Sequence, residues 1–234
     1  VLEFVRFDPN VTGIRLDLSG RDAVLMNAHD AHIWSFEDSL EPIQRGVVEG
    51  DPYLVDGTWV GDTIVVVSRY GSVTAFGAST LDDVVELGTV VLQSPDYGLL
   101  AMAGDLGLTW WRDGPVQSWA IPPNGDPRAL GTVAIPATAS EDQHDLEIVG
   151  EYAVACGSEL TVIDLTVPAE PSVVGSLAME FATCIARNDG MIVGASCRQI
   201  FTIDLSDPET PSVVDRHDVD EGILQVVYFD DVVY

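Results

Sequence analysis

Short apolar runs alternate with polar turns along the whole chain, and the pattern recurs roughly every 40 residues. Five segments align as two strand-like runs around a polar turn, at residues 23–36, 63–76, 108–121, 152–165 and 191–204. Another run precedes each pair, and a loop and a fourth run follow it. Turns rich in Gly, Asp and Ser between short apolar runs are typical of β-hairpins. Each repeat therefore predicts four short antiparallel strands, which we call a, b, c and d in chain order.

Four antiparallel strands at this period are the sequence signature of a β-propeller blade. The rungs of a β-helix are shorter, a leucine-rich repeat needs a Leu and Asn pattern, and no segment has helical periodicity. We predict an all-β fold, a β-propeller of four-stranded antiparallel blades with six to eight blades in total. Five full blades and parts of a sixth are visible, at roughly 12–52, 53–95, 96–139, 145–180, 183–221 and, in part, 223–234.

The chain is expected to form a single propeller domain over residues 1–234. Residues 1–7, VLEFVRF, stand where a d strand belongs, and the chain stops within a b strand. A propeller closes by completing one blade from both chain ends, and the c strand of that blade is missing here. We therefore expect the sequence to be an excerpt that is incomplete at its C-terminus.

Two stretches 40 residues apart are nearly the same: TVIDLTVPAEPSVVG at 161–175 and FTIDLSDPETPSVVD at 201–215. Together with the VGEYAV hairpin at 149–154, they resemble the LVIVD-repeat β-propellers of bacterial and archaeal surface proteins. The resemblance covers residues 145–215. In the first three units SFED, AFGA and WAIPP replace the Asp-Leu pair, and only the spacing of the strands supports the assignment there.

The resemblance implies a secreted or cell-surface location and a noncatalytic binding or scaffolding role, and it supplies no catalytic residues. The alternative is a propeller-fold hydrolase or lyase that acts on extracellular polysaccharide. Such an enzyme would need carboxylates from several blades to converge. The sequence contains no G-x-S-x-G elbow, phosphate-binding loop or dinucleotide fingerprint that would favour an enzyme.

The formal net charge is −28, and all ten basic residues are Arg. Nucleic acids and anionic lipids bind basic patches, so neither is an expected partner. No apolar run reaches the length needed for direct membrane insertion as a helix. Two origins fit the composition: the proteome of a halophile, or an acidic secreted protein from a genome that favours Arg codons.

Several residues invite a metal or thiol interpretation. His29 and His32 in HDAH flank a predicted b–c turn, but zinc needs three or four converging ligands, so solvated turn residues are the favoured interpretation and no metal site is assigned. Calcium is kept as an alternative for the acidic loops at 140–145 and 218–222. Cys156, Cys184 and Cys197 lack C-x-x-C spacing. We expect three free thiols, with Cys184 opposite Val193.

Large aromatic side chains are expected mainly in the core. Trp110 and Trp111 lie in one b strand, and Trp34 and Trp119 occupy matching c-strand positions. Although an aromatic patch can bind sugar, large apolar side chains more often fill the space between blades.

The candidate ligand-binding residues lie in the b–c turns, which propeller symmetry brings to one face, the top face. Although basic residues are scarce, four of the five turns contain one, and Tyr70 adds an aromatic side chain; the candidates are His29, Arg69, Tyr70, Arg112 and Arg198. Exposed turns tolerate Arg, so chance is the competing explanation. Guanidinium groups bind carboxylates and sulfates through forked hydrogen bonds, so the expected partner is a protein or an acidic glycan.

The net charge predicts that salt stabilises the protein. Screening shortens the range of charge repulsion from about 8 Å at physiological ionic strength to about 3 Å in 1 M salt. The melting temperature should therefore rise between low salt and 1 M NaCl, as followed by circular dichroism. A flat profile would show that the acidic residues are too dispersed to repel one another.

Overall fold

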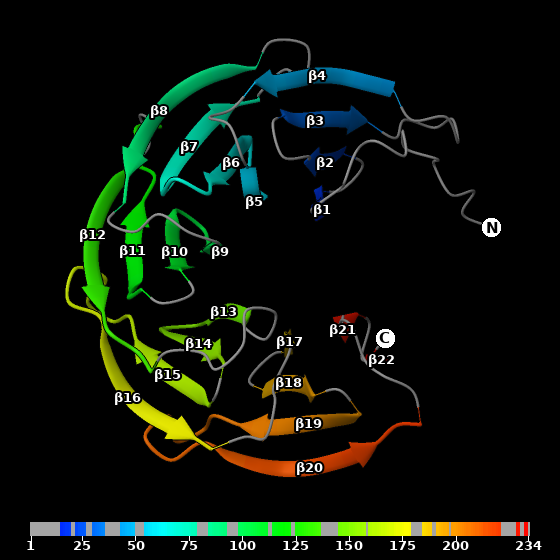
Figure 1. Cartoon of the computed structure of the whole chain (residues 1–234), viewed down its shortest axis with the longest axis vertical. Coiled ribbons are helices and arrows are strands. Elements are labelled where there is room, and N and C mark those ends of the chain that lie inside the picture. Colours follow the sequence, from blue (N-terminus) through cyan, green and yellow to red (C-terminus); the bar gives the residue numbers. More distant parts are fainter. Residues whose placement is uncertain are drawn as a thin grey trace. The chain divides into compact units, whose positions relative to one another are not determined.

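The computed structural model describes most of the repeat region (Figure 1). The described residues are 15–19, 22–26, 30–35, 43–49, 54–78, 84–92, 98–111, 114–122, 125–136, 145–157, 159–178, 184–188, 191–196, 198–220, 228–229 and 232–233. Every element of regular structure within these residues is a β-strand. None of them belongs to a helix that could cross a membrane.

The strands form five four-stranded antiparallel sheets in which each strand pairs with the next one along the chain. The first sheet contains β1 (Arg15–Ser19), β2 (Asp22–Met26), β3 (Asp30–Ser35) and β4 (Ile43–Glu49). The second contains β5 (Leu54–Val60), β6 (Thr63–Ser68), β7 (Ser72–Gly77) and β8 (Val85–Val91). The third contains β9 (Gly98–Ala103), β10 (Leu106–Trp111), β11 (Val116–Ala120) and β12 (Arg128–Val133).

The last two full sheets follow the same plan. The fourth contains β13 (Asp145–Val149), β14 (Tyr152–Cys156), β15 (Leu160–Asp164) and β16 (Ser172–Leu177). The fifth contains β17 (Cys184–Asn188), β18 (Met191–Ser196), β19 (Gln199–Asp204) and β20 (Ser212–Asp218). A two-stranded sheet follows, with β21 (Tyr228–Phe229) and β22 (Val232–Val233).

This topology confirms the predicted all-β fold and the a, b, c and d strands of five successive repeats. β15 and β19, which contain the duplicated motif, are equivalent third strands. β21 and β22 are the predicted a and b strands of the sixth repeat. The d strand expected at residues 1–7 lies outside the described residues.

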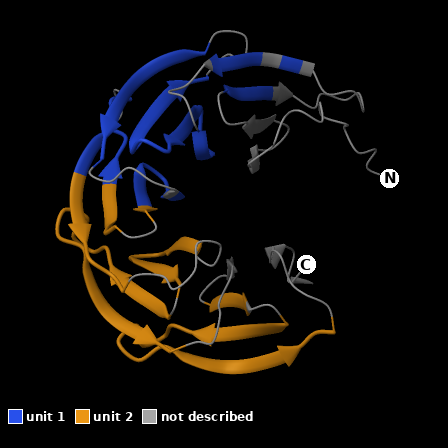
Figure 2. Cartoon of the chain, viewed as in Figure 1, with its two compact units in different colours: residues 1–109, 119–129 blue, residues 110–118, 130–234 orange. Residues whose placement is uncertain are grey.

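Two compact units make up the chain (Figure 2). One comprises residues 1–109 and 119–129, and the other comprises residues 110–118 and 130–234. Each unit is described by itself, and the division passes through the third sheet. The expectation of a single domain stays a prediction.

The middle strands of the sheets are buried on both faces. Five consecutive residues are buried in β6, in β7 and in β10, and four in β14 and in β15. In the first unit, Ile33 of the first sheet packs with Ile64 and Phe76 of the second. In the second unit, Val162 of the fourth sheet packs with Ile192 and Phe201 of the fifth. Within each unit, successive sheets therefore pack against each other through buried side chains.

The d strands carry a β-bulge at one repeated position. In four of the sheets, one residue of the d strand has no partner on the c strand; these residues are Arg45, Leu87, Val174 and Val214. The residue after the bulge is Gly46, Gly88 and Gly175 in three of these sheets and Asp215 in the fifth. Bulges at corresponding places are features of the fold rather than local defects.

Gly88 and Gly175, together with Gly131 of β12, each lie against the c–d loop of the following sheet. A methyl group on Gly175 would lie 2.1 Å from the carbonyl oxygen of Pro208. The same group on Gly131 would lie 2.4 Å from the carbonyl oxygen of Ala169, and on Gly88 it would lie 2.4 Å from Asp126 Oδ1. We call this contact the glycine seat. It explains why a Pro-containing loop and a Val-Val-Gly strand recur together.

The Asp of the repeated Asp-Leu motif caps the loop that fills the glycine seat. Asp164 Oδ1 accepts the Thr166 N–H at 2.7 Å, and Asp204 Oδ1 accepts the Ser206 N–H at 2.8 Å. These backbone hydrogen bonds, together with side-chain bonds from the same Thr and Ser, lower the pKa values of both carboxyls. The two loops therefore begin with the same Asx turn.

Buried Asp56 joins the first strands of two successive sheets. Its side chain is 2% exposed, beside a bulge in β5. Oδ1 accepts the Gly57 N–H at 2.8 Å, and Oδ2 accepts the Leu100 N–H of β9 at 2.9 Å. A buried carboxylate is tolerated when its oxygens are hydrogen-bonded in this way.

The thiol predictions can be checked in part. Within the described part of the chain, Cys156 is buried and forms no disulfide. The expected partner of Cys184 was wrong by two residues, because Asn188 pairs with Met191 and this register places Cys184 opposite Ala195. Cys197 lies outside the described residues.

The glycine seat predicts a position-specific cost of adding a methyl group. Gly175→Ala should lower the free energy of unfolding by about 2 kcal/mol, because the obstruction is backbone that cannot rotate away. Gly77→Ala is the matched control, since its methyl group would meet only the flexible Leu87 side chain at 3.2 Å. Urea unfolding of both variants provides the comparison, and equal losses would contradict the glycine seat.

Asp56 predicts a second measurable loss. Asp56→Asn keeps the shape but places an NH₂ group against one of the two backbone N–H groups, so we expect a loss of about 2 kcal/mol. Asp62→Asn, at an exposed turn of the same sheet, removes the same charge and should change stability by less than about 0.5 kcal/mol. If both substitutions are neutral in urea unfolding, Asp56 does not hold the two strands together.

Candidate ligand-binding site

The b–c turn of the second sheet presents two of the predicted site residues. Arg69 and Tyr70 lie between β6 and β7, and the Tyr70 side chain is 52% exposed. The Gly71 N–H donates to the Ser68 carbonyl at 3.0 Å and closes a β-turn around them. Gly71 has φ of 82°, a conformation that disfavours other residues. Arg69 and Tyr70 therefore form the exposed tip of a defined turn.

Two buried serines, Ser68 and Ser72, hold this turn in place through hydrogen bonds. Ser68 Oγ lies 2.6 Å from Ser72 Oγ and also accepts the N–H groups of Tyr70 and Ser72, each at 3.3 Å. The Gly71 carbonyl accepts the Leu92 N–H at 2.7 Å, which ties the turn to the end of the d strand. The position of Arg69 and Tyr70 is thus fixed by backbone and buried hydroxyls.

Arg198 lies in the b–c turn of the fifth sheet, as predicted. It is exposed, and its carbonyl accepts the Val219 N–H at 2.9 Å. The next residue, Gln199, donates to Asp218 Oδ1 at 2.7 Å. Arg69 and Arg198 belong to different compact units. His29 and Arg112 lie outside the described residues, so the cationic face stays a prediction.

The other sequence candidates have ordinary structural surroundings where they are described. His32 lies within β3 rather than beside the turn, and its Nδ1 is 3.2 Å from Gln44 Nε2. Asp218, from one of the two loops with a calcium alternative, accepts the Gln199 bond, and residues 140–144 of the other loop lie outside the described residues. Trp110, Trp111 and Trp119 are at most 2% exposed, which confirms their core role. Within the described residues, no three His, Cys, Asp or Glu side chains gather as metal ligands.

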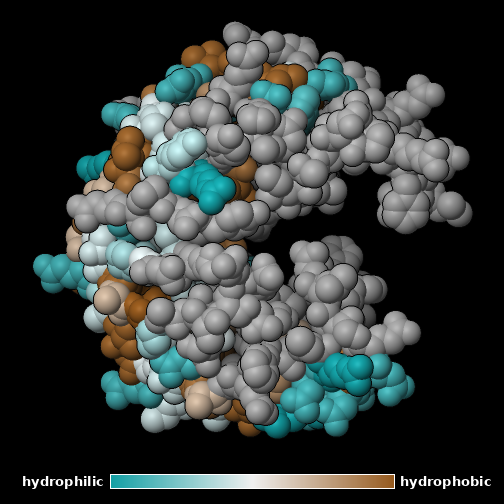
Figure 3. All heavy atoms as spheres, viewed as in Figure 1, coloured by the Kyte–Doolittle hydropathy of each residue, from teal (hydrophilic) through white to brown (hydrophobic). Residues whose placement is uncertain are grey.

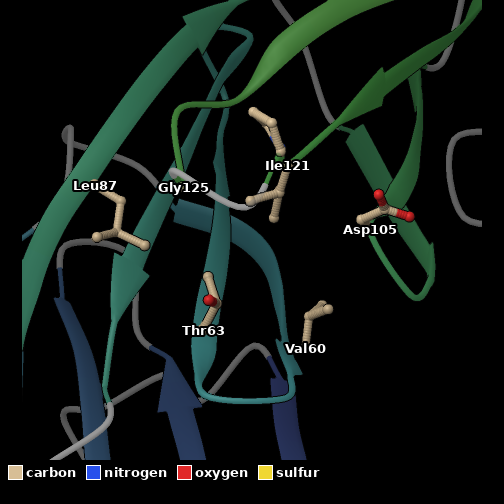
Figure 4. A pocket seen from close by; sticks show the side chains of 7 residues that line it. Val60, Thr63, Leu87, Asp105, Ile121 and Gly125 are labelled. Atoms are coloured by element: carbon tan, nitrogen blue, oxygen red, sulfur yellow. The ribbon is translucent and has the colours of Figure 1, made fainter.

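A small open pocket lies at the opposite end of the second sheet, among residues of the first unit (Figure 4). Its volume is about 260 Å³. It is lined by Val60, Thr63, Leu87, Asp105, Ile121, Pro122 and Gly125. Leu87 is the bulge residue of β8, and Asp105 lies in the two-residue turn between β9 and β10. The pocket therefore forms where the d strand of one sheet meets the turns of the next.

The walls of this pocket are held by backbone hydrogen bonds. The Ile121 N–H donates to the Asp105 carbonyl at 2.9 Å, and the Gly125 N–H donates to the Pro122 carbonyl at 2.7 Å. Gly125 has φ of 82°, and a methyl group there would lie 2.6 Å from Leu87 Cδ1. This pocket was not predicted from the sequence. Its only local signals, the Gly-Asp turn and the PNGDP loop, are also ordinary turn sequences.

The described surface mixes apolar and polar side chains (Figure 3). Exposed valines lie on d strands, including Val85 and Val91 of β8 and Val214 of β20. Single exposed apolar residues are normal on protein surfaces, so these valines do not by themselves indicate a binding site.

No protein-family model and no curated protein matches the sequence. Solved structures do match. Sqt1 of Saccharomyces cerevisiae is similar with a TM-score of 0.66 and 11% identity, over 97% of this chain and 80% of that one. A functionally unknown protein from Desulfotomaculum acetoxidans gives a TM-score of 0.75 and 12% identity, over 93% and 74%.

A chain in the crystal structure of the Mitotic Checkpoint Complex is also similar, with a TM-score of 0.73 and 13% identity over 93% of this chain and 69% of that one. Sequence identities this low carry information on fold alone. Combined with the five successive four-stranded meanders, the likeness shows that the chain has the β-propeller fold.

Proposed function

We propose that this β-propeller is a noncatalytic binding module of a secreted or cell-surface protein, and that a partner with exposed carboxylates docks on its b–c turns. The observation that carries the proposal is the turn at Arg69 and Tyr70. A guanidinium group and a half-exposed phenol ring stand together on a turn fixed by buried hydroxyls, in a protein of net charge −28. Scarce cations on such a turn favour a specific anionic contact.

The chemistry of the turn fits recognition of a carboxylate. A guanidinium group can donate two parallel hydrogen bonds to one carboxylate, which fixes orientation as well as position. The neighbouring Tyr70 can pack against an apolar or aromatic part of the partner. The serine hydroxyls below the turn bond each other and turn amides, which is a structural role. These features support binding rather than turnover.

The LVIVD resemblance supports the proposed location. The two repeats that carry it, around Asp164 and Asp204, form equivalent third strands and equivalent Asx turns. The loops after them also share a turn: the Glu170 N–H donates to Val167, and the Thr210 N–H donates to Asp207. The repeated sequence thus produces a repeated structure, as in surface propellers of that type.

A protein is the favoured partner. One similar structure is a chain of the Mitotic Checkpoint Complex, a multi-component assembly by its name. Propeller blades expose their turns together on a face, and protein segments with Asp or Glu side chains provide carboxylates at well-defined spacing. An acidic glycan offers the same chemical group, so the experiment below distinguishes the two sources.

The test replaces the arginines of three b–c turns. Arg69, Arg112 and Arg198 are changed together to Gln, and binding is measured to an immobilised Glu-rich peptide and to immobilised polygalacturonate. We expect peptide binding to the wild type, and at least about tenfold weaker peptide binding by the triple variant, because charge-assisted hydrogen bonds are lost. The melting temperature should hardly change, since exposed turn side chains contribute little to stability.

Arg128→Gln is the matched control. This residue is exposed at the start of β12, at the end of the sheet away from the b–c turns, and its substitution changes charge in the same direction. Polygalacturonate binding without peptide binding would identify a glycan partner in place of a protein. The proposal is wrong if the wild type binds neither probe, or if the triple variant and Arg128→Gln bind as well as the wild type.

A further inference from the structure

The pocket at the a–b turn end of the second sheet has apolar walls and a carboxylate at its margin. Val60, Leu87, Ile121 and Pro122 supply apolar surface, while Thr63 adds a hydroxyl. Among the seven lining residues, Asp105 supplies the only carboxylate. Figure 4 shows Leu87 on one side and Asp105 on the other, with Ile121 and Thr63 between them.

The size of the pocket suits one side chain. Pockets that hold drug-sized ligands usually range from about 300 to 1,000 Å³. At about 260 Å³ and open to solvent, this one is below that range. Because its walls are fixed by the hydrogen bonds of Ile121 and Gly125, it does not need to form upon binding.

The negative charge of the Asp105 carboxylate favours a cationic side chain as the occupant of the pocket. Asp105 is exposed, and the structure shows no hydrogen bond or ion pair between its carboxylate and another described side chain. An apolar occupant would take water from this carboxylate without replacing the lost hydrogen bonds, and an acidic occupant would be repelled. A Lys or Arg side chain has an apolar stem for the walls and a cation for the margin.

We infer that this pocket receives a Lys or Arg side chain from a protein partner, with the aliphatic stem between Leu87 and Ile121 and the cation beside Asp105. The net charge of −28 favours this occupant further, since it attracts cationic segments from a distance. The inference adds a second surface to the proposed binding role. It lies at the end of the sheet opposite Arg69 and would hold even if the b–c turns bind nothing.

The chain provides a matched pair of acidic residues for the test. Asp62 and Asp105 each follow a positive-φ glycine, Gly61 or Gly104, in the a–b turn of successive sheets. The carbonyl of each accepts an N–H from the residue after the c strand, at 2.7 Å for Ala78 and 2.9 Å for Ile121. Only Asp105 lines the pocket. Substitution by Asn removes the same charge from the same kind of turn in both cases.

The experiment uses ¹⁵N-labelled protein and three heptapeptides that carry a central Lys, norleucine or Glu between Gly and Ser residues. We expect the Lys peptide to shift the amide signals of residues 60–63, 105, 121 and 125 at low salt, the norleucine peptide to shift them more weakly, and the Glu peptide to have no effect. Asp105→Asn should weaken the Lys peptide about fivefold, as expected for one exposed ion pair.

Asp62→Asn should weaken the Lys peptide by much less, because it changes only the general field. Arg69→Gln should leave the pocket signals unchanged and the affinity for the Lys peptide unchanged or slightly improved. The pocket inference and the b–c turn proposal can therefore fail independently. Three results would overturn the inference: equal loss in the two Asn variants, shifts spread over the acidic surface without preference for the pocket, or equal binding of the norleucine peptide.

Discussion

The structure depends on the burial of both faces of the middle strands in the second, third and fourth sheets. β6, β7, β10, β14 and β15 consist almost entirely of buried residues, so a sheet with one exposed face would present a continuous apolar surface to water. Both faces of such a sheet must therefore be covered. This requirement leaves the turns, the ends of the strands and the d strands for contact with other molecules, and the candidate binding residues lie there.

The two ends of the sheets differ in the chemistry of their turns. At one end, the b–c turns of the second and fifth sheets expose Arg69 and Arg198, with Arg69 beside the aromatic Tyr70 in the chain. At the other end, the a–b turns expose Asp62, Asp105 and Glu151, each following a glycine. These acidic residues accept backbone hydrogen bonds through their carbonyls. The two proposed binding surfaces therefore lie at opposite ends of the second sheet and differ in charge.

The fold was predictable from sequence because its signals are local and repeated. Strand periodicity, turn residues and the spacing of the repeats lie within single units, and the a–b hairpins form where predicted, although the register of the hairpin in the fifth sheet differs from the predicted one by two residues. The features that were missed involve two repeats at once. No pattern within one repeat indicates that Gly175 contacts Pro208, that Asp56 accepts the N–H of Leu100, or that Leu87 and Asp105 line one pocket. Such contacts depend on how successive sheets stack, which the spacing of one repeat does not encode.

The glycine seat relates successive sheets in one direction along the chain. The loop that covers Gly88, Gly131 or Gly175 belongs to the repeat that follows it along the chain. During synthesis, a blade leaving the ribosome stays uncovered at this place until the third strand and loop of its successor have emerged. Stable structure then advances from the N-terminus one blade behind synthesis. By the same geometry, lengthening a c–d loop would disturb the preceding blade rather than the blade that carries the loop.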